Sequence, residues 1–316
     1  MRRQVVVLSL SVLLVLLALA PRAIAPIPRP AYARGDFWSY RTFLAEEIGF
    51  AFAGNTTITA GDVIEVPVQG STVRALEMSV EGIGTFSGAF PPFGTAAGTW
   101  VLTGTEHWDA ESWSSVRSFA RLTATGAFQT SPSPVPFTFG ITNETTRRID
   151  EETFGWPVAD GATGETRAHW NASVNLTIQF EGSPTQWNTS WIDGDFVTTH
   201  AQNGTAILAF GGATFDTYRI DEAGPEGPHR VRWYAPRVGG DVRQEEYNET
   251  GGTVASSELT DFRYQAGEPP PPFPWLYSII VALATSAAVL LVVLGLKRRR
   301  PFETGPPRSP AEKRSP

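Results

Sequence analysis

The densest cluster of titratable side chains lies at residues 106–111, Glu-His-Trp-Asp-Ala-Glu. If this stretch is a strand, His107 and Asp109 lie on the face opposite to Glu106 and Trp108, because successive side chains alternate. An imidazole beside a carboxylate can serve general acid–base catalysis. A solvated strand end is the other interpretation, and we favour it because no serine stands in a Gly-x-Ser-x-Gly turn.

The remaining histidines add no metal-binding pattern. They stand at positions 169, 200 and 229, without the short His–His spacing typical of zinc sites. We therefore expect no catalytic residues, no metal and no cofactor. An extracytoplasmic hydrolase remains an alternative, because only the fold decides which carboxylates face each other.

Asparagine is the residue type whose spacing indicates a chemistry most clearly, that of N-linked glycosylation. All seven Asn residues are followed at the second position by Ser or Thr, with no Pro between. With Ser and Thr at about a sixth of the chain, the probability of this by chance is on the order of one in a hundred thousand or less. The predicted acceptors are Asn55, Asn143, Asn171, Asn175, Asn188, Asn203 and Asn248.

Composition excludes several classes of protein. The 316 residues are 41% hydrophobic and 11% aromatic, which is too apolar for a disordered chain. A net charge of −7 does not fit a nucleic-acid-binding protein. The chain has no cysteine, which excludes disulfide bonds, Cys-ligated metals and a cysteine nucleophile. Its core must be held together by packing.

The N-terminus has the features of a secretion signal. Residues 1–35 contain five Arg and no acidic residue, and an apolar run covers residues 5–20. Cleavage after Ala20 or Ala25 would place a Pro directly after the cut. The small-x-small sequence ending at Ala33 is the better site, so we expect a signal peptide at residues 1–33, with an uncleaved anchor as the alternative.

A second apolar run predicts a membrane anchor near the C-terminus. Residues 275–296 form 22 positions without a charge, long enough to span a bilayer as a helix. Trp275 and Tyr277 would lie at one interface, and Lys297, Arg298, Arg299 and Arg300 would hold the other end in the cytoplasm. The prediction is a single-pass, type I cell-membrane protein with most of its chain extracellular.

The flanking segments complete the predicted organisation. Residues 268–274 are rich in Pro and read as a stiff stalk, and residues 297–316 read as a disordered, basic cytoplasmic tail. The extracellular domain then covers residues 34–267. Within it, residues 36–272 carry 13 Arg against 11 Asp and 19 Glu and no Lys, which indicates an acidic exterior. The Arg bias, with sequons and no cysteine, favours an archaeal surface protein.

The extracellular domain has the composition of an all-β fold. In residues 171–180, Val174, Leu176 and Ile178 alternate with Asn171 and Asn175, which is typical of an antiparallel strand with one buried face. Ten or more such strands must curl or fold on themselves to make a core. We predict a long curled antiparallel sheet, either half-barrel or sandwich-like, with an N-terminal signal helix and one C-terminal transmembrane helix.

Two apolar, proline-bearing stretches read as loops. Residues 84–98 contain Phe86, Phe90 and Phe93, and residues 134–139 are similar. Such loops could form the rim of an apolar pocket, or they could tuck into the core, which we favour. Trp187 and Trp191 are the candidate pair for carbohydrate binding, although Trp more often fills a sheet core.

Three stretches carry a resemblance to a known type of protein. Residues 35–40 (Gly-Asp-Phe-Trp-Ser-Tyr), residues 153–161 and the closing series over residues 211–262 resemble uncharacterised extracytoplasmic proteins of the lipoprotein-carrier-like half-β-barrel type. The resemblance implies an antiparallel sheet around an apolar groove, which holds acyl chains in the lipid-carrying relatives. It brings no catalytic residues.

Together these features predict a function without catalysis. We expect a membrane-anchored extracellular surface glycoprotein that acts as a binding or cell-envelope module. Its partners would be the membrane and lipid or envelope components, and not nucleic acid. The alternatives are a tethered apolar-ligand or lipid-binding half-barrel and an extracytoplasmic hydrolase.

Overall fold

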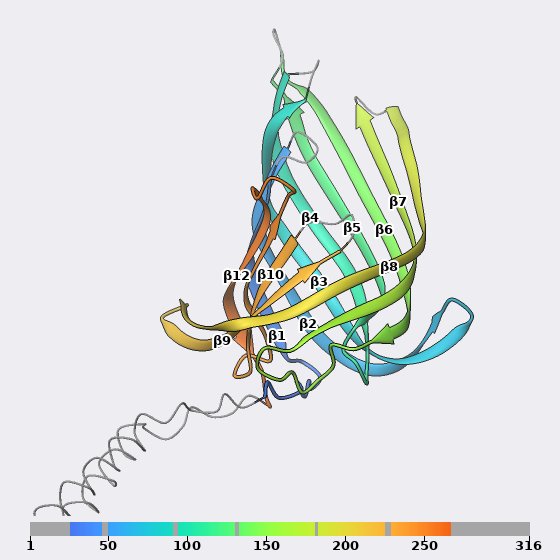
Figure 1. Ribbon diagram of the computed structural model, residues 1–316. Helices are drawn as coiled ribbons and strands as arrows, with labels where there is room; N and C mark the ends of the chain where they lie inside the picture. Colours follow the sequence, from blue (N-terminus) through green and yellow to red (C-terminus); the bar gives the residue numbers. More distant parts are fainter. Residues whose placement is uncertain are drawn as a thin grey trace, which may run out of the picture. The chain divides into compact units, whose positions relative to one another are not determined.

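The structure is a computed structural model that describes residues 26–45, 50–90, 94–129, 133–180, 183–224 and 229–266. These residues form one closed antiparallel barrel, in which each strand pairs with its neighbours along the chain and β1 pairs with β12 (Figure 1). The strands are β1 (Phe37–Leu44), β2 (Phe50–Val68), β3 (Ser71–Phe90), β4 (Gly94–Asp109), β5 (Ser115–Phe128), β6 (Val135–Glu152), β7 (Thr163–Phe180), β8 (Ser183–Phe210), β9 (Ala213–Ala223), β10 (His229–Ala235), β11 (Gly240–Tyr247) and β12 (Thr253–Arg263).

The all-β prediction is confirmed, but the prediction of an open curled sheet is wrong. Strand β1 pairs with β12 from Phe37 opposite Arg263 to Leu44 opposite Ala255, which closes the sheet into a ring. The described chain contains no helix, so the expected combination of sheet and helices is also wrong for this part of the molecule. Residues 1–25 of the predicted signal and the whole of residues 267–316 lie outside the described residues.

No helix within the described ranges has the length and the hydropathy that a membrane crossing requires. The predicted stalk, the apolar run with Trp275 and Tyr277, and the basic cluster from Lys297 to Arg300 all lie outside those ranges.

Two of the hairpins have local sequence causes. The turn between β2 and β3 places Gln69 and Gly70 at φ values of 45° and 87°, and the turn between β8 and β9 places Gly211 and Gly212 at 55° and 81°. Two-residue hairpin turns with positive φ at both central positions match the twist of the strands they join. Glycine adopts that conformation without a steric penalty, and these glycines therefore help to fix the register.

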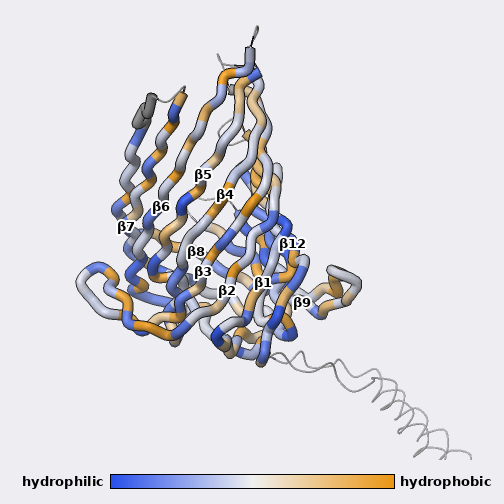
Figure 2. The backbone as a smooth tube through the Cα atoms, turned by 180° about the vertical axis from the view of Figure 1, so that it is seen from behind, coloured by the Kyte–Doolittle hydropathy of each residue, from blue (hydrophilic) through white to orange (hydrophobic). Residues whose placement is uncertain are grey.

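Alternation of side chains separates the inside of the barrel from the outside. On β3, Met78 is fully buried and Phe86 is nearly so, whereas Ile83, which has the opposite parity, is 64% exposed. Figure 2 shows apolar and polar residues alternating along the long strands β4 to β7. The alternation predicted for residues 171–180 is present, because Leu176 and Ile178 pack against buried aromatic residues inside the barrel while Asn171 is exposed.

The interior of one half of the barrel is filled by aromatic rings. We call this the aromatic cluster, and its members are Phe50, Phe52, Phe86, Trp100, Phe128, Phe137 and Phe139. Rings from strands that are not neighbours touch, as between Phe86 on β3 and Phe139 on β6, whose centroids are 5.7 Å apart. Residues 84–90 and 94–98, expected to form a loop, are therefore mostly strand, and Phe86 points into the core.

Strand β8 changes partner along its length. It pairs with β7 from Ser183 to Ala201 and with β9 from Thr199 to Phe210, so it descends beside β7 and then sweeps across the barrel (Figure 1). Within the described residues, positions 183–198 pair with β7 alone. This half of β8 is a free edge of the sheet.

Candidate functional site

The predicted pair of His107 and Asp109 does not form. The closest acidic partner of His107 is Glu77 on the neighbouring strand, with its Oε2 3.8 Å from the imidazole Nε2. Asp109 Oδ1 instead accepts hydrogen bonds from the backbone amides of Glu111 and Ser112. Burial lowers the pKa of His107. This cluster therefore terminates β4 and shapes the turn after it.

His169 has the closest contacts with carboxylates of any described histidine. Its Nδ1 lies 2.7 Å from Asp195 Oδ1 and its Nε2 lies 3.0 Å from Asp193 Oδ1, on the outer surface between β7 and β8. These two hydrogen bonds, that of Asp195 first, raise the pKa of His169. Across the described residues, no group of three or more His, Asp or Glu side chains has the arrangement of a metal site.

Sequence reasoning missed a network of charged side chains built by β9 to β11. Arg232 is its centre: its Nη1 donates to Glu222 Oε1 at 2.9 Å and its Nε donates to Asp241 Oδ2 at 2.8 Å. Arg230 Nε donates to Glu246 Oε1 at 2.8 Å, and the guanidinium also lies 3.6 Å from Glu222 Oε2. We call these five residues the ion network.

His200 extends the ion network toward β7. Its Nδ1 lies 3.5 Å from Glu222 Oε1, and its Nε2 is hydrogen-bonded to the Thr166 hydroxyl at 3.0 Å. Burial alone would raise the pKa of Glu222, but the two guanidinium groups and the imidazole around it hold that pKa well below its usual range. Glu222 is therefore a stable carboxylate at neutral pH and not a proton donor.

The ion network faces the interior of the barrel. Arg147 on β6 is largely buried, and burial lowers its pKa, while Glu106 on β4 raises it and Arg230 on β10 lowers it. Because β4, β6 and β10 are not neighbours in the sheet, these charges approach each other across the interior. Arg147 also lies over the ring of Trp170 at 4.2 Å. The alternation of Arg230 and Arg232 along β10 was a signal in the sequence for the ion network. The acidic partners of these two arginines are set by strand pairing, which the sequence does not show.

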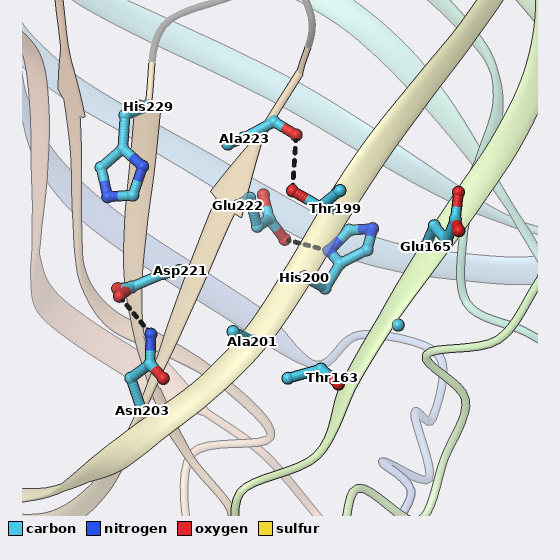
Figure 3. A pocket seen from close by; sticks show the side chains of 11 residues that line it. Thr163, Glu165, Thr199, His200, Ala201, Asn203, Asp221, Glu222, Ala223 and His229 are labelled. Carbon is cyan, nitrogen blue, oxygen red and sulfur yellow. Dashed lines mark hydrogen bonds and ion pairs between the residues drawn. The ribbon is translucent and has the colours of Figure 1, made fainter.

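A depression of about 480 Å³ lies beside the ion network, across β7, β8, β9 and β10. Figure 3 shows its polar side chains, among them Glu165, Asn203, Asp221 and His229. The Asn203 amide donates to Asp221 Oδ2 at 2.6 Å. One of the predicted glycosylation sites thus lines this depression.

The sequon asparagines differ in their exposure and in the face of the sheet on which they lie. Asn55, Asn171, Asn188, Asn203 and Asn248 are exposed, and Asn175 is half-buried on the outer face of β7. Asn143 has the parity of Phe139 and Thr145, which are 4% and 5% exposed, so it faces the interior. The sequence marks all seven asparagines alike, and only the strand register separates them.

The predicted ligand-binding aromatics are not assembled into a site among the described side chains. Phe86 is 2% exposed within the aromatic cluster, and Trp191 is 71% exposed on β8. Phe93 and the side chains of Phe90 and Trp187 lie outside the described part of the structure.

Comparison with known proteins adds no family: no family model, no curated protein and no solved structure matches this chain.

Proposed function

We propose that this protein is a membrane-anchored extracellular surface glycoprotein whose barrel is a non-catalytic binding or cell-envelope module. The observation that carries the proposal is the exposure of the asparagines: five of the seven sequon asparagines are exposed, and Asn175 is half-buried on the outer face of β7. Exposed asparagines on a folded domain are accessible to a glycosylating enzyme. The apolar run at residues 275–296 with its basic flank supplies the proposed anchor.

The packed interior also favours a surface role over ligand storage. Rings of the aromatic cluster contact each other across the barrel, as between Phe50 and Phe139 at 6.2 Å. Several charged groups of the interior are paired, as are Glu222 and Asp241, which are both bonded to Arg232. Side chains that satisfy each other in this way stabilise the barrel and leave its outer face to meet partners.

Two measurements on the native protein test the proposal. Glycopeptide mass spectrometry is expected to find glycans on several of the exposed asparagines. Alkaline extraction of membranes is expected to leave the full chain in the pellet and to release a variant that ends at Gly267. Unmodified asparagine at all seven positions would contradict the glycoprotein assignment, and release of the full chain would contradict the anchor.

A further inference from the structure

The segment that precedes the first strand is built into the barrel. We call residues 27–33 the strap. Ile27 exchanges two backbone hydrogen bonds with Val158, at 2.8 Å from its amide and 3.1 Å to its carbonyl. Its side chain is 1% exposed and packs with Val158, Ile220 and Tyr234. Ile27 is therefore part of the hydrophobic core.

Tyr32 holds the other end of the strap. Its hydroxyl donates to the carbonyl oxygen of Gly239 at 2.9 Å. Its ring contacts those of Trp38 and Trp113 edge-on, at centroid distances of 5.4 Å and 4.9 Å. Beside it, the Ala31 amide donates to the Tyr264 hydroxyl at 2.9 Å. The strap thus joins aromatic side chains from both ends of the described chain.

A buried carboxylate fastens the strap to the end of the barrel. Asp36 is fully buried, and its Oδ2 accepts a hydrogen bond from the Ala33 amide at 2.9 Å. Its Oδ1 accepts one from the Gln265 amide at 3.0 Å. The strap, the start of β1 and the segment after β12 therefore share one side chain.

We propose that the exported protein keeps the strap, and that any proteolytic processing falls before Ile27 and not after Ala33. Residues discarded with a signal peptide make no contacts in the mature fold, yet Ile27 is buried in the core and Tyr32 packs against it. A cut after Ala33 would leave the backbone groups of Val158 without these partners and open a void against Trp38. This inference concerns the N-terminus alone and does not depend on the proposed C-terminal anchor or on glycosylation.

Mapping the N-terminus of the native protein tests the proposal directly. The protein is purified from the cells that make it, its free amino terminus is labelled, and the labelled peptide is identified by mass spectrometry. A first residue at position 27 or earlier is expected. A chain that begins at Arg34 would overturn the proposal.

Variants of the full-length chain test whether the strap contributes to folding. Tyr32→Ala is expected to lower the Tm by roughly 10 °C, because it removes a packed ring and its hydrogen bond. The control is Arg34→Ala, an exposed residue that pairs with Asp62 at the surface and is expected to leave the Tm within about 1 °C. An unchanged Tm for Tyr32→Ala would contradict the proposal.

If Tyr32→Ala does not accumulate, Tyr32→Phe replaces it. This variant keeps the ring and loses only the hydrogen bond to Gly239, so a fall in Tm of roughly 2–4 °C is expected. A Tm equal to that of the unmodified chain would overturn the proposal.

Discussion

At the scale of single residues, parity along a strand decides what a side chain can do. Asn143 and Asn175 lie on adjacent strands and both belong to sequons, but Asn143 points inward and Asn175 outward. Inside, Asn143 Oδ1 accepts a hydrogen bond from the Thr145 hydroxyl at 3.2 Å. A saccharide attached to Asn143 would have to occupy the packed interior.

We therefore expect Asn143 to be unmodified in the native protein while Asn175 or Asn171 on the neighbouring strand carries a glycan. Glycopeptide mass spectrometry with site-by-site occupancy measures this. A glycan on Asn143 at an occupancy equal to that of Asn171 would show that the strand register is not the one described.

At the scale of elements, close contact between strands depends on glycine facing a large aromatic ring. The ring of Trp100 covers Gly54 on β2 and Gly84 on β3. A Cβ at Gly84 would meet the Ala53 carbonyl oxygen at 2.1 Å and the Trp100 ring at 2.7 Å. Neither contact is sterically acceptable, so both glycines are needed for the ring to lie flat on the sheet.

Gly84→Ala is expected to lower the free energy of unfolding by about 2–3 kcal/mol, because backbone and ring must both move. Chemical denaturation monitored by tryptophan fluorescence measures the change. Gly155→Ala is the matched control, since a Cβ there meets no atom within 4 Å and a change within about 0.5 kcal/mol is expected. Equal stability of the two variants would refute the packing argument.

The free edge of β8 is a second feature at the scale of strands. Positions 183–198 expose one row of backbone groups, a template for pairing with another chain. Asn188 is exposed on this edge, and Asp193 and Asp195 add exposed negative charge. A glycan and like charges both oppose edge-to-edge pairing.

In the native host, Asn188→Gln is therefore expected to increase self-association, measured by light scattering coupled to size-exclusion chromatography. Asn248→Gln, which alters a sequon at the turn between β11 and β12, is expected to leave the association state unchanged. The same monomer fraction for both variants would mean that a glycan at Asn188 does not protect the edge.

At the scale of the whole molecule, the ion network stabilises the interior of the barrel by pairing charges from three strands, β9, β10 and β11. Glu222 is bonded to Arg232 and lies within reach of Arg230 and His200. Removing one partner of a buried ion pair leaves the other charge without compensation. Glu222→Gln is expected to reduce the free energy of unfolding at pH 7 by about 3 kcal/mol.

This contribution has a defined pH dependence. The folded state depresses the pKa of Glu222, so the stabilisation is present above the ordinary glutamate value of 4.5 and is lost as pH falls toward the folded-state pKa. Urea titrations from pH 7 to pH 3 should show the difference between wild type and Glu222→Gln shrinking below pH 4.5. Glu65→Gln, an exposed residue, is the control, and a difference that stays constant with pH would contradict this assignment.

The sequence by itself determined the local features of this protein. Alternation in residues 171–180 predicted a strand with one buried face, and the paired glycines at 211 and 212 set a tight turn. Strand alternation and a tight turn depend only on residues that are close together in the chain. The uncharged run at residues 275–296 and the spacing of the sequons are likewise local features of the sequence. Period and composition are therefore enough to identify them.

Only the tertiary structure decided the closure, the interior charges and the place of the strap. The pairing of β1 with β12 joins residues more than two hundred positions apart, and the ion network depends on the register of three strands. Ile27 and Tyr32 read as part of a secretion signal until Val158 and Gly239 are placed beside them. Hydrogen bonds and packing act at a few ångströms, and the sequence does not state which distant residues come within that range.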